Sequence, residues 1–216
     1  EEEGVEERHR EGEGGAAVGG LDAFGRVPMK VAVVGDSAVG KTCLVTRFVE
    51  GKYDEDYIET LGMAGFEKVI KVRGQEILFD IWDIGGQRDF STVPLVCVDA
   101  DAVLIAFDLS RLSSLFSLKE WLRFLVPLVN QAGKKCHLVL VGTKFELFKD
   151  LPPQEQEEIV KMARAVAHLL CAPLVFTSVA ESIHVQKVFG ILLCRVFGLK
   201  CTIPRVETVG YPLLEY

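Results

Sequence analysis

Short apolar runs alternate with stretches of helical periodicity from Met29 onward. Six runs have the length and composition of buried strands: Lys30–Val34, Phe66–Val72, Glu76–Trp82, Ala102–Phe107, His137–Val141 and Pro173–Phe176. Apolar residues recur at helical spacing between Ile159 and Leu170 and between Val185 and Val196. This alternation predicts an α/β fold in which helices cover both faces of a mostly parallel sheet.

Arg73-Gly74-Gln75 separates the second run from the third and predicts a hairpin. The expected sheet therefore has six strands, one of which is an antiparallel edge strand. Because ligands of such sheets bind beyond the carboxyl ends of the strands, the residues that follow each apolar run are candidates for a functional site.

The chain has 216 residues, of which 49% are hydrophobic and 25% are charged, as is typical of a single soluble domain. No apolar run is long enough to span a membrane, and no signal peptide is evident. Six scattered cysteines lack a Cys-x-x-Cys pair. We therefore expect free thiols in the reducing cytosol rather than disulfides or a zinc site.

The net charge of -7 is concentrated at the start of the chain. Residues 1–20 hold seven acids and two arginines, a balance of -5, so the rest of the chain carries only -2. An acidic, glycine-rich segment buries too little apolar surface to offset its ordering entropy, which predicts a disordered arm over residues 1–27. The folded domain is expected over residues 28–200. No basic stripe indicates nucleic acid binding.

Gly35-Asp-Ser-Ala-Val-Gly-Lys41-Thr42 follows the first predicted strand and matches G-x-x-x-x-G-K-[ST] at every fixed position. Its glycines allow backbone N–H groups to surround a polyphosphate, and the following helix presents its N-terminus to the negative charge. Lys41 is expected to neutralise the outer phosphates, while Thr42 places a hydroxyl on Mg²⁺. Alone, this motif indicates an NTPase or a nucleotide kinase.

A second motif, Asp83-Ile-Gly-Gly86-Gln87, ends the third predicted strand. In a nucleotide site the acid can hold Mg²⁺ through water, Gly86 can donate its N–H to the terminal phosphate, and Gln87 can orient the attacking water. A simple turn would explain the glycines but not the order Asp-x-Gly-Gly-Gln. Between the two motifs, the polar segment Gly51–Leu61 contains Thr60, a hydroxyl that can reach Mg²⁺ and the γ-phosphate from a loop.

These motifs resemble the small GTPases of the Ras superfamily over about residues 29–199. A closer resemblance is to the septum-promoting GTPase group, which controls cytokinesis and mitotic exit. The segments that carry it are Tyr57–Gly62, Ile81–Arg88, Pro94–Cys97, Leu147–Pro152, Ser182–Phe189 and Phe197–Pro204, and several of these have no role in nucleotide chemistry. The match is therefore specific to a subfamily and not only to proteins with a phosphate loop.

The resemblance implies a G domain that binds GTP or GDP with Mg²⁺. The phosphate side of the nucleotide would contact Asp36, Ser37, Ala38, Val39, Gly40, Lys41, Thr42, Cys43, Tyr57, Thr60 and Gly86. The base side would contact Tyr53, Thr143, Lys144, Glu146, Ser178, Val179 and Ala180. Mg²⁺ would be held by Thr42, Thr60 and Asp83, and catalysis would depend on Gln87, Lys41 and Thr60.

The base side departs from the family pattern. Thr143 stands where the family has asparagine, Glu146 where it has aspartate, and Ala180 where it has lysine. Glutamate keeps the carboxylate that accepts two guanine N–H groups, but its extra methylene shifts that carboxylate by about 1.5 Å, and losing part of this contact weakens binding roughly tenfold. The alternative is that Glu146 points to solvent and does not contact the base.

The first functional hypothesis is a monomeric GTP/GDP switch upstream of a protein kinase cascade in cytokinesis or septation. No arginine finger is evident in cis, so efficient hydrolysis is expected to need a GTPase-activating protein, alongside an exchange factor and a kinase effector. Residues 201–216 form a tail without a prenylation box or polybasic run, so we expect no direct lipid anchor. Partners would recruit this cytoplasmic protein to the spindle pole or division site.

Two alternatives remain. A nucleotide-holding scaffold would bind GTP but scarcely hydrolyse or exchange it, and the altered base motif slightly favours this reading. Intact Lys41, Thr42, Thr60 and Gln87 argue against it. An ATPase or nucleotide kinase is disfavoured by the Asp-x-Gly-Gly-Gln motif.

Overall fold

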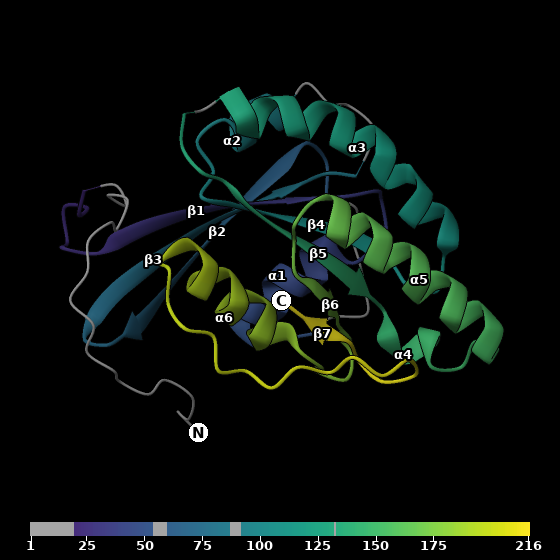
Figure 1. Ribbon diagram of the computed structural model, residues 1–216. Helices are drawn as coiled ribbons and strands as arrows, with labels where there is room; N and C mark the ends of the chain where they lie inside the picture. Colours follow the sequence, from purple (N-terminus) through teal and green to yellow (C-terminus); the bar gives the residue numbers. More distant parts are fainter. Residues whose placement is uncertain (1–19, 54–59, 87–91, 132) are drawn as a thin grey trace.

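A twisted seven-stranded sheet forms the centre of the molecule (Figure 1). The computed structural model describes residues 20–53, 60–86, 92–131 and 133–216. The strand order is β2-β3-β1-β4-β5-β6-β7. The strands are β1 Val27–Val34, β2 Met63–Val72, β3 Gln75–Ile84, β4 Ala102–Asp108, β5 His137–Thr143, β6 Leu174–Phe176 and β7 Leu214–Glu215.

Parallel pairing joins β3, β1, β4, β5 and β6, whereas β2 and β7 are antiparallel edge strands. The β2–β3 hairpin turns at Arg73 and Gly74, which both have positive φ angles of 49° and 84°, as a tight hairpin turn of this hand requires. The predicted fold class and hairpin are confirmed. The seventh strand, β7, was not predicted because a two-residue strand leaves no periodic pattern in the sequence.

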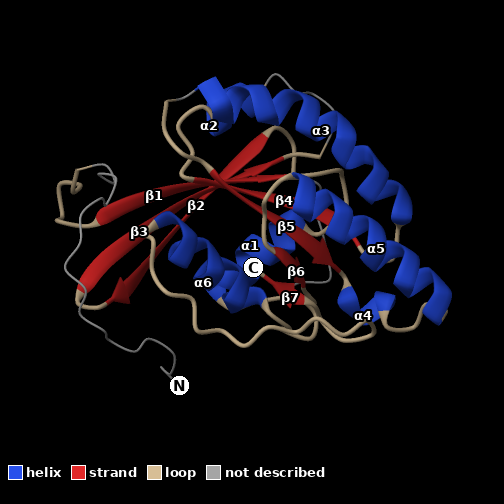
Figure 2. Ribbon diagram, in the orientation of Figure 1, coloured by secondary structure: helices blue, strands red, loops and turns tan. Residues whose placement is uncertain are grey.

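Helices cover both faces of the sheet (Figure 2). They are α1 Lys41–Glu50, α2 Val93–Cys97, α3 Leu112–Gln131, α4 Phe145–Phe148, α5 Pro153–Leu169 and α6 Val185–Val196. The apolar sides of α2, α3, α4 and α5 share one hydrophobic cluster with the sheet, and those of α1 and α6 share the other. None of the described helices is long and apolar enough to cross a membrane.

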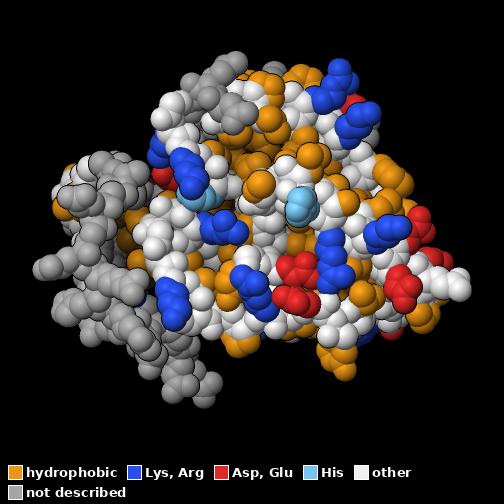
Figure 3. Space-filling view, viewed as in Figure 1, with side chains coloured by type: hydrophobic (Ala, Val, Ile, Leu, Met, Phe, Trp, Pro, Cys, Tyr) orange, Lys and Arg blue, Asp and Glu red, His pale blue; other side chains and the backbone are white. Residues whose placement is uncertain are grey.

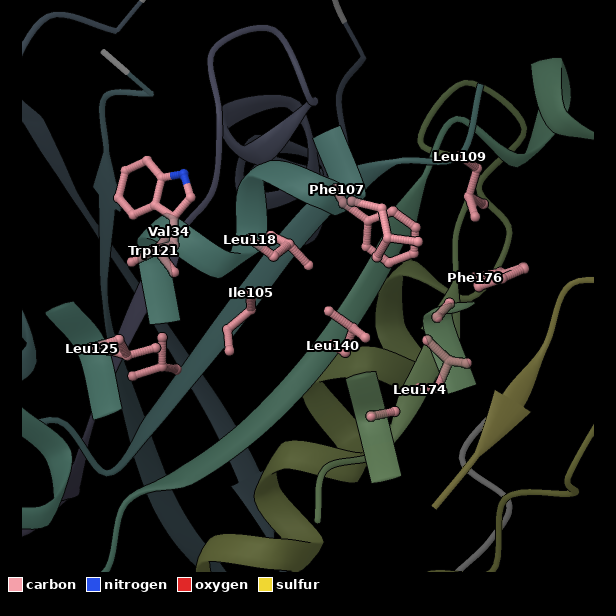
Figure 4. Packing of buried hydrophobic residues seen from close by; sticks show 14 of the residues in the cluster. Val34, Ile105, Phe107, Leu109, Leu118, Trp121, Leu125, Leu140, Leu174 and Phe176 are labelled. Carbon is pink, nitrogen blue, oxygen red and sulfur yellow. The ribbon is translucent and has the colours of Figure 1, made fainter. Parts of the chain in front are cut away.

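The central strand β4 is buried along its whole length because its side chains alternate between the two clusters. Ile105 and Phe107 point into the cluster under α3 and α5, which Figure 4 shows from close by. Ala102 and Leu104 point into the opposite cluster, where Phe48 of α1 stacks on Phe189 of α6 with ring centroids 3.6 Å apart. This rigid centre fixes the carboxyl ends of the strands.

At the two ends of the chain, the structure shows contacts that the sequence did not predict. Residues 1–19 of the predicted arm lie outside the described residues, but Asp22 organises a turn by accepting hydrogen bonds from the backbone N–H groups of Phe24 and Arg26. Residues 201–216, predicted as a tail, pack back onto the domain and supply β7. On the face seen in Figure 3, basic and acidic side chains of the described residues are interspersed, without a basic stripe.

Candidate nucleotide site

The loop between β1 and α1 has a backbone path that favours glycine at both of its ends. Gly35 has φ 142°, and a Cβ there would lie 2.2 Å from the carbonyl oxygen of Ala106. Gly40 has φ 88° and caps the N-terminus of α1, so Lys41 is the first helical residue. Sequence therefore dictates both the curl of this loop and the direction in which the helix N-terminus points.

Lys41 crosses the loop that it follows. Its ammonium group donates hydrogen bonds to the carbonyl oxygens of Gly35 and Asp36, each at 2.9 Å, and the residue is only 4% exposed. A buried ammonium group held at the mouth of a glycine loop is suited to binding an anion, because few water molecules compete for it.

Three residues predicted to hold a metal ion lie together beside this loop. The hydroxyl oxygen of Thr42 is 2.5 Å from Oδ2 of Asp83 and 2.8 Å from the hydroxyl of Thr60. Oδ1 of Asp83 is buried without a hydrogen-bond partner among the described residues. Burial raises the pKa of Asp83, against the lowering effects of the Thr42 bond, the Lys41 charge and the Thr60 bond. Two hydroxyls and an underused carboxylate fit Mg²⁺, a cation that prefers oxygen ligands.

Gly85 and Gly86 pass so close to neighbouring backbone that no side chain fits. A Cβ at Gly86 would lie 2.0 Å from the backbone nitrogen of Ser37, and one at Gly85 would lie 2.5 Å from the carbonyl oxygen of Thr60. The Gly85 N–H donates to the carbonyl oxygen of Gly62 at 2.7 Å. The end of β3 therefore joins the phosphate loop to the segment that carries Thr60. The predicted catalytic Gln87 and the predicted contact Tyr57 lie outside the described residues.

Two residues of the α3 region brace the phosphate loop and were not predicted. The indole N–H of Trp121 donates to Oδ1 of Asp36 at 2.9 Å, and the Arg111 guanidinium donates to the Ser37 carbonyl oxygen at 3.1 Å. Trp121 is only 1% exposed, and nothing in the sequence distinguishes it from an ordinary core residue. Its hydrogen bond to Asp36 could therefore not be predicted from the sequence. The side chain of Asp36, predicted to contact nucleotide, is engaged with Trp121.

Thr143 joins the base side to the phosphate loop. Its hydroxyl lies 2.5 Å from the carbonyl oxygen of Val39 and 2.9 Å from that of Phe107. The shorter side chain that replaces the family's asparagine thus still reaches the phosphate loop. The neighbouring Gly142 lets the strands approach closely, since a Cβ there would lie 2.7 Å from the Leu109 side chain.

Lys144 and Glu146 take up defined positions after β5. Lys144 has φ 58°, and its ammonium group lies 2.7 Å from Oδ2 of Asp108, a carboxylate at the end of β4 that the sequence did not single out. Oε2 of Glu146 is buried without a hydrogen-bond partner among the described residues. The structure therefore turns this oxygen inward, in contrast to the solvent-facing alternative. A buried carboxylate oxygen without a donor is suited to bind a ligand N–H.

The loop that contains Ser178, Val179 and Ala180 lies next to this segment. The Thr177 carbonyl oxygen accepts a hydrogen bond from the backbone of Phe145 at 3.0 Å. Lys149 and Glu181 add an ion pair at 2.5 Å. The two predicted base-reading segments are thus joined to each other by backbone and side-chain contacts. Of the other predicted contacts, Tyr53 is 40% exposed and Cys43 is half-buried on α1.

Comparison with known proteins accounts for this arrangement. A sequence profile described as the Ras family matches residues 30–197. The chain belongs to the Ras family. Septum-promoting GTP-binding protein 1 of Schizosaccharomyces pombe is 49% identical over 191 residues, which cover 88% of this chain and 94% of that protein. GTP-binding protein YPTM1 of Zea mays is 30% identical over 74% of both chains, and human Ras-related protein Rab-30 is 31% identical over 85% of this chain and 87% of its own.

Membership of the Ras family makes the chain a small GTPase, with guanine nucleotide as its ligand, generally together with Mg²⁺, and GTP hydrolysis as its general activity. The predicted resemblance is therefore confirmed. The Ras-family match includes both sides of the site, from Lys41 to Ala180. Regulators and effectors are expected of such a protein in general.

Proposed function

We propose that this GTPase is a GTP/GDP switch whose conformation depends on the γ-phosphate through Thr60 and Gly86. The observation that carries the proposal is the convergence of Thr60, Gly86, Thr42 and Asp83 at the mouth of the phosphate loop. A γ-phosphate placed there would attract both the Thr60 segment and the end of β3, and its release by hydrolysis would free them.

The residues of the phosphate side have separate tasks in this mechanism. The Lys41 ammonium and the loop N–H groups would hold the β- and γ-phosphates. Thr42, Thr60 and Asp83 would hold Mg²⁺, which when bound supplies positive charge against the charge that develops on the phosphate oxygens. Gln87 would orient the water for attack in line with the leaving group.

The base side supports guanine as the ligand. The inward carboxylate of Glu146 can accept from the N1–H and 2-amino groups of guanine, and the loop after β6 can donate a backbone N–H to the oxygen at C6. Adenine lacks this donor pair, so binding it would leave the buried oxygen unsatisfied. The stem of Lys144, fixed by Asp108, would lie along the base.

In the cell, we infer a role in cytokinesis or septation signalling, upstream of a protein kinase cascade. This inference rests on the 49% identity with septum-promoting GTP-binding protein 1 across nearly the whole of both chains. A GTPase-activating protein, an exchange factor and a kinase effector would act on the switch. Such partners would bring it to the spindle pole or the division site.

Two measurements test the switch. The purified protein is denatured, and the released nucleotide is identified by chromatography; GDP or GTP is expected, and ATP or ADP would overturn the assignment. Single-turnover hydrolysis of GTP is then followed with and without Mg²⁺. Slow hydrolysis that requires Mg²⁺ supports the switch, whereas GTP that is bound but neither hydrolysed nor exchanged would favour the nucleotide-holding scaffold.

The proposed role of Gln87 is tested separately. Gln87→Leu should strongly lower turnover stimulated by an activating protein and spare GTP binding.

A further inference from the structure

The segment of residues 201–216 returns from the end of α6 to the far edge of the sheet, where it supplies β7 (the yellow strand of Figure 1). We propose that this segment is a positioning element of the guanine site, which holds the loop Ser178–Ala180 in place and so sets how firmly and how selectively the base is bound. The inference rests on the proposed function, since it concerns the same base pocket.

The most direct contact is between backbones. The Phe176 N–H donates to the carbonyl oxygen of Leu213 at 2.8 Å, and β7 continues the pairing with Val175 opposite Leu214. The strand β6 has only three residues, and Phe176, its last, is two positions before Ser178. The C-terminal segment therefore fixes the strand end from which the base-reading loop departs.

Two adjacent leucines anchor the segment on opposite faces of the sheet. Leu213 belongs to the cluster that also contains Phe176, Phe145 and Phe148, while Leu214 belongs to the opposite cluster. Both are fully buried. Figure 4 shows β7 beside Leu174 and Phe176 at the edge of the first cluster. A strand held from both faces cannot shift without exposing one of these side chains, so it acts as a fixed support for β6.

Polar contacts join the same segment to the elements around the base. The Arg164 guanidinium of α5 forms an ion pair with Glu215 at 2.6 Å and also donates to the carbonyl oxygen of Glu207. Nδ1 of His184, the residue before α6, lies 3.2 Å from the carbonyl oxygen of Phe176. The end of β6, from which the loop departs, is thus held both by the residue that precedes α6 and by the C-terminal segment.

The segment of residues 201–216 also approaches Gln156, which holds the chain that follows Glu146 and α4. Gln156 donates to the carbonyl oxygens of Lys149 at 3.1 Å and Leu151 at 2.9 Å, directly after α4. A Cβ at Gly210 would lie 3.6 Å from Oε1 of the same glutamine, so the backbone of the segment passes close to this side chain. Together with the Lys149–Glu181 ion pair, these contacts couple the segment to both base-reading loops.

A chain that lacks residues 207–216 tests the proposal when the synthetic peptide of those residues is added back. GDP release is measured, together with the affinity for 6-thioguanosine 5′-diphosphate, which keeps the N1–H and 2-amino groups of guanine but has sulfur, a weaker acceptor, in place of the oxygen at C6. We expect GDP release to accelerate about tenfold and the preference for GDP over this analogue to fall by a similar factor, because the loop no longer holds its N–H against that oxygen. The peptide should restore both values.

A matched pair of full-length variants guards against a merely unstable truncated chain. Leu213→Ala and Leu125→Ala remove the same group from the same hydrophobic cluster, at residues that are 0% and 1% exposed, but Leu125 lies on α3. Only Leu213→Ala should reduce the preference for GDP over the analogue. Equal preferences in the two variants, or faster release with unchanged preference in the truncated chain, would overturn the role of the segment. A wild-type chain that binds no guanine nucleotide would instead refute the switch itself.

Discussion

The phosphate side and the base side of the site are built in different ways. Most of the phosphate side comes from one continuous loop, with Thr60, Asp83 and Gly86 brought to it by neighbouring elements. The base side is assembled from two loops that are separated in the sequence and supported by β7, and it contains the substitutions Thr143 and Glu146. The phosphate side depends on the path of the backbone and therefore tolerates few substitutions. The base side depends on side chains, which can vary as long as the elements that hold their loops stay in place.

The largest expected effect is that of Lys41→Ala. The buried ammonium group has no substitute at the mouth of the loop, and hydrogen bonds to charged groups contribute about 1.5–3 kcal/mol each, so GDP binding should weaken by at least about 100-fold. Calorimetric titration with GDP measures this loss. Lys161→Ala, an exposed lysine on α5, is the control and should bind as wild type. Similar affinities in the two variants would show that Lys41 does not contact the phosphates.

Asp83→Asn should distinguish the contribution of the metal ion to nucleotide affinity from that of the direct phosphate contacts. The amide keeps the shape of the side chain but removes its charge, so GTP binding in Mg²⁺ should weaken about tenfold or more, with little change in EDTA. Affinities measured in the two buffers give the result. An equal loss with and without Mg²⁺ would count against a metal-binding role for this carboxylate.

The same variant has a signature in stability. Because burial raises the pKa of Asp83, the folded protein without metal holds this proton more tightly than the unfolded chain does. The wild-type protein without metal should therefore lose stability as pH rises from the ordinary aspartate pKa through the raised value. Asp83→Asn should remove that part of the pH dependence. Urea unfolding in EDTA across this pH window provides the measurement.

Glu146→Asp tests the base side directly. Shortening the side chain restores the family's carboxylate position, so GDP binding should tighten by up to about tenfold. The GDP dissociation rate is the readout, and Glu158→Asp on the exposed face of α5 is the matched control. Unchanged dissociation in both variants would mean that the Glu146 carboxylate does not contact the base.

Trp121→Phe should have the smallest effect. It keeps an aromatic ring in the core but removes the N–H that holds Asp36, a loss of about 1 kcal/mol that should weaken nucleotide binding about fivefold. Trp82→Phe is a close control, because Nε1 of Trp82 is buried without a hydrogen-bond partner among the described residues. Equal nucleotide affinities in the two variants would show that the Asp36 contact does not matter for the loop.

The sequence predicted more of the phosphate side than of the base side. Gly35 to Thr42 could be interpreted residue by residue, because each position has a fixed relation to its neighbours along one loop and one helix start. The inward turn of Glu146 could not be predicted, since it depends on the packing of the loops after β5 and β6. Trp121 and Asp108 were missed for a similar reason: each acts on a residue from another part of the chain.

The sequence by itself determined the strand–helix alternation, the hairpin and the phosphate loop, because hydrophobic periodicity and glycine conformations are local properties. Only the tertiary structure decided that Trp121 holds Asp36, 85 positions away, and that Leu213 and Leu214 complete the sheet beside the base-reading loop. These contacts depend on which surfaces meet once the helices have packed on the sheet. A two-residue strand or a single buried N–H carries no periodic signal in the sequence.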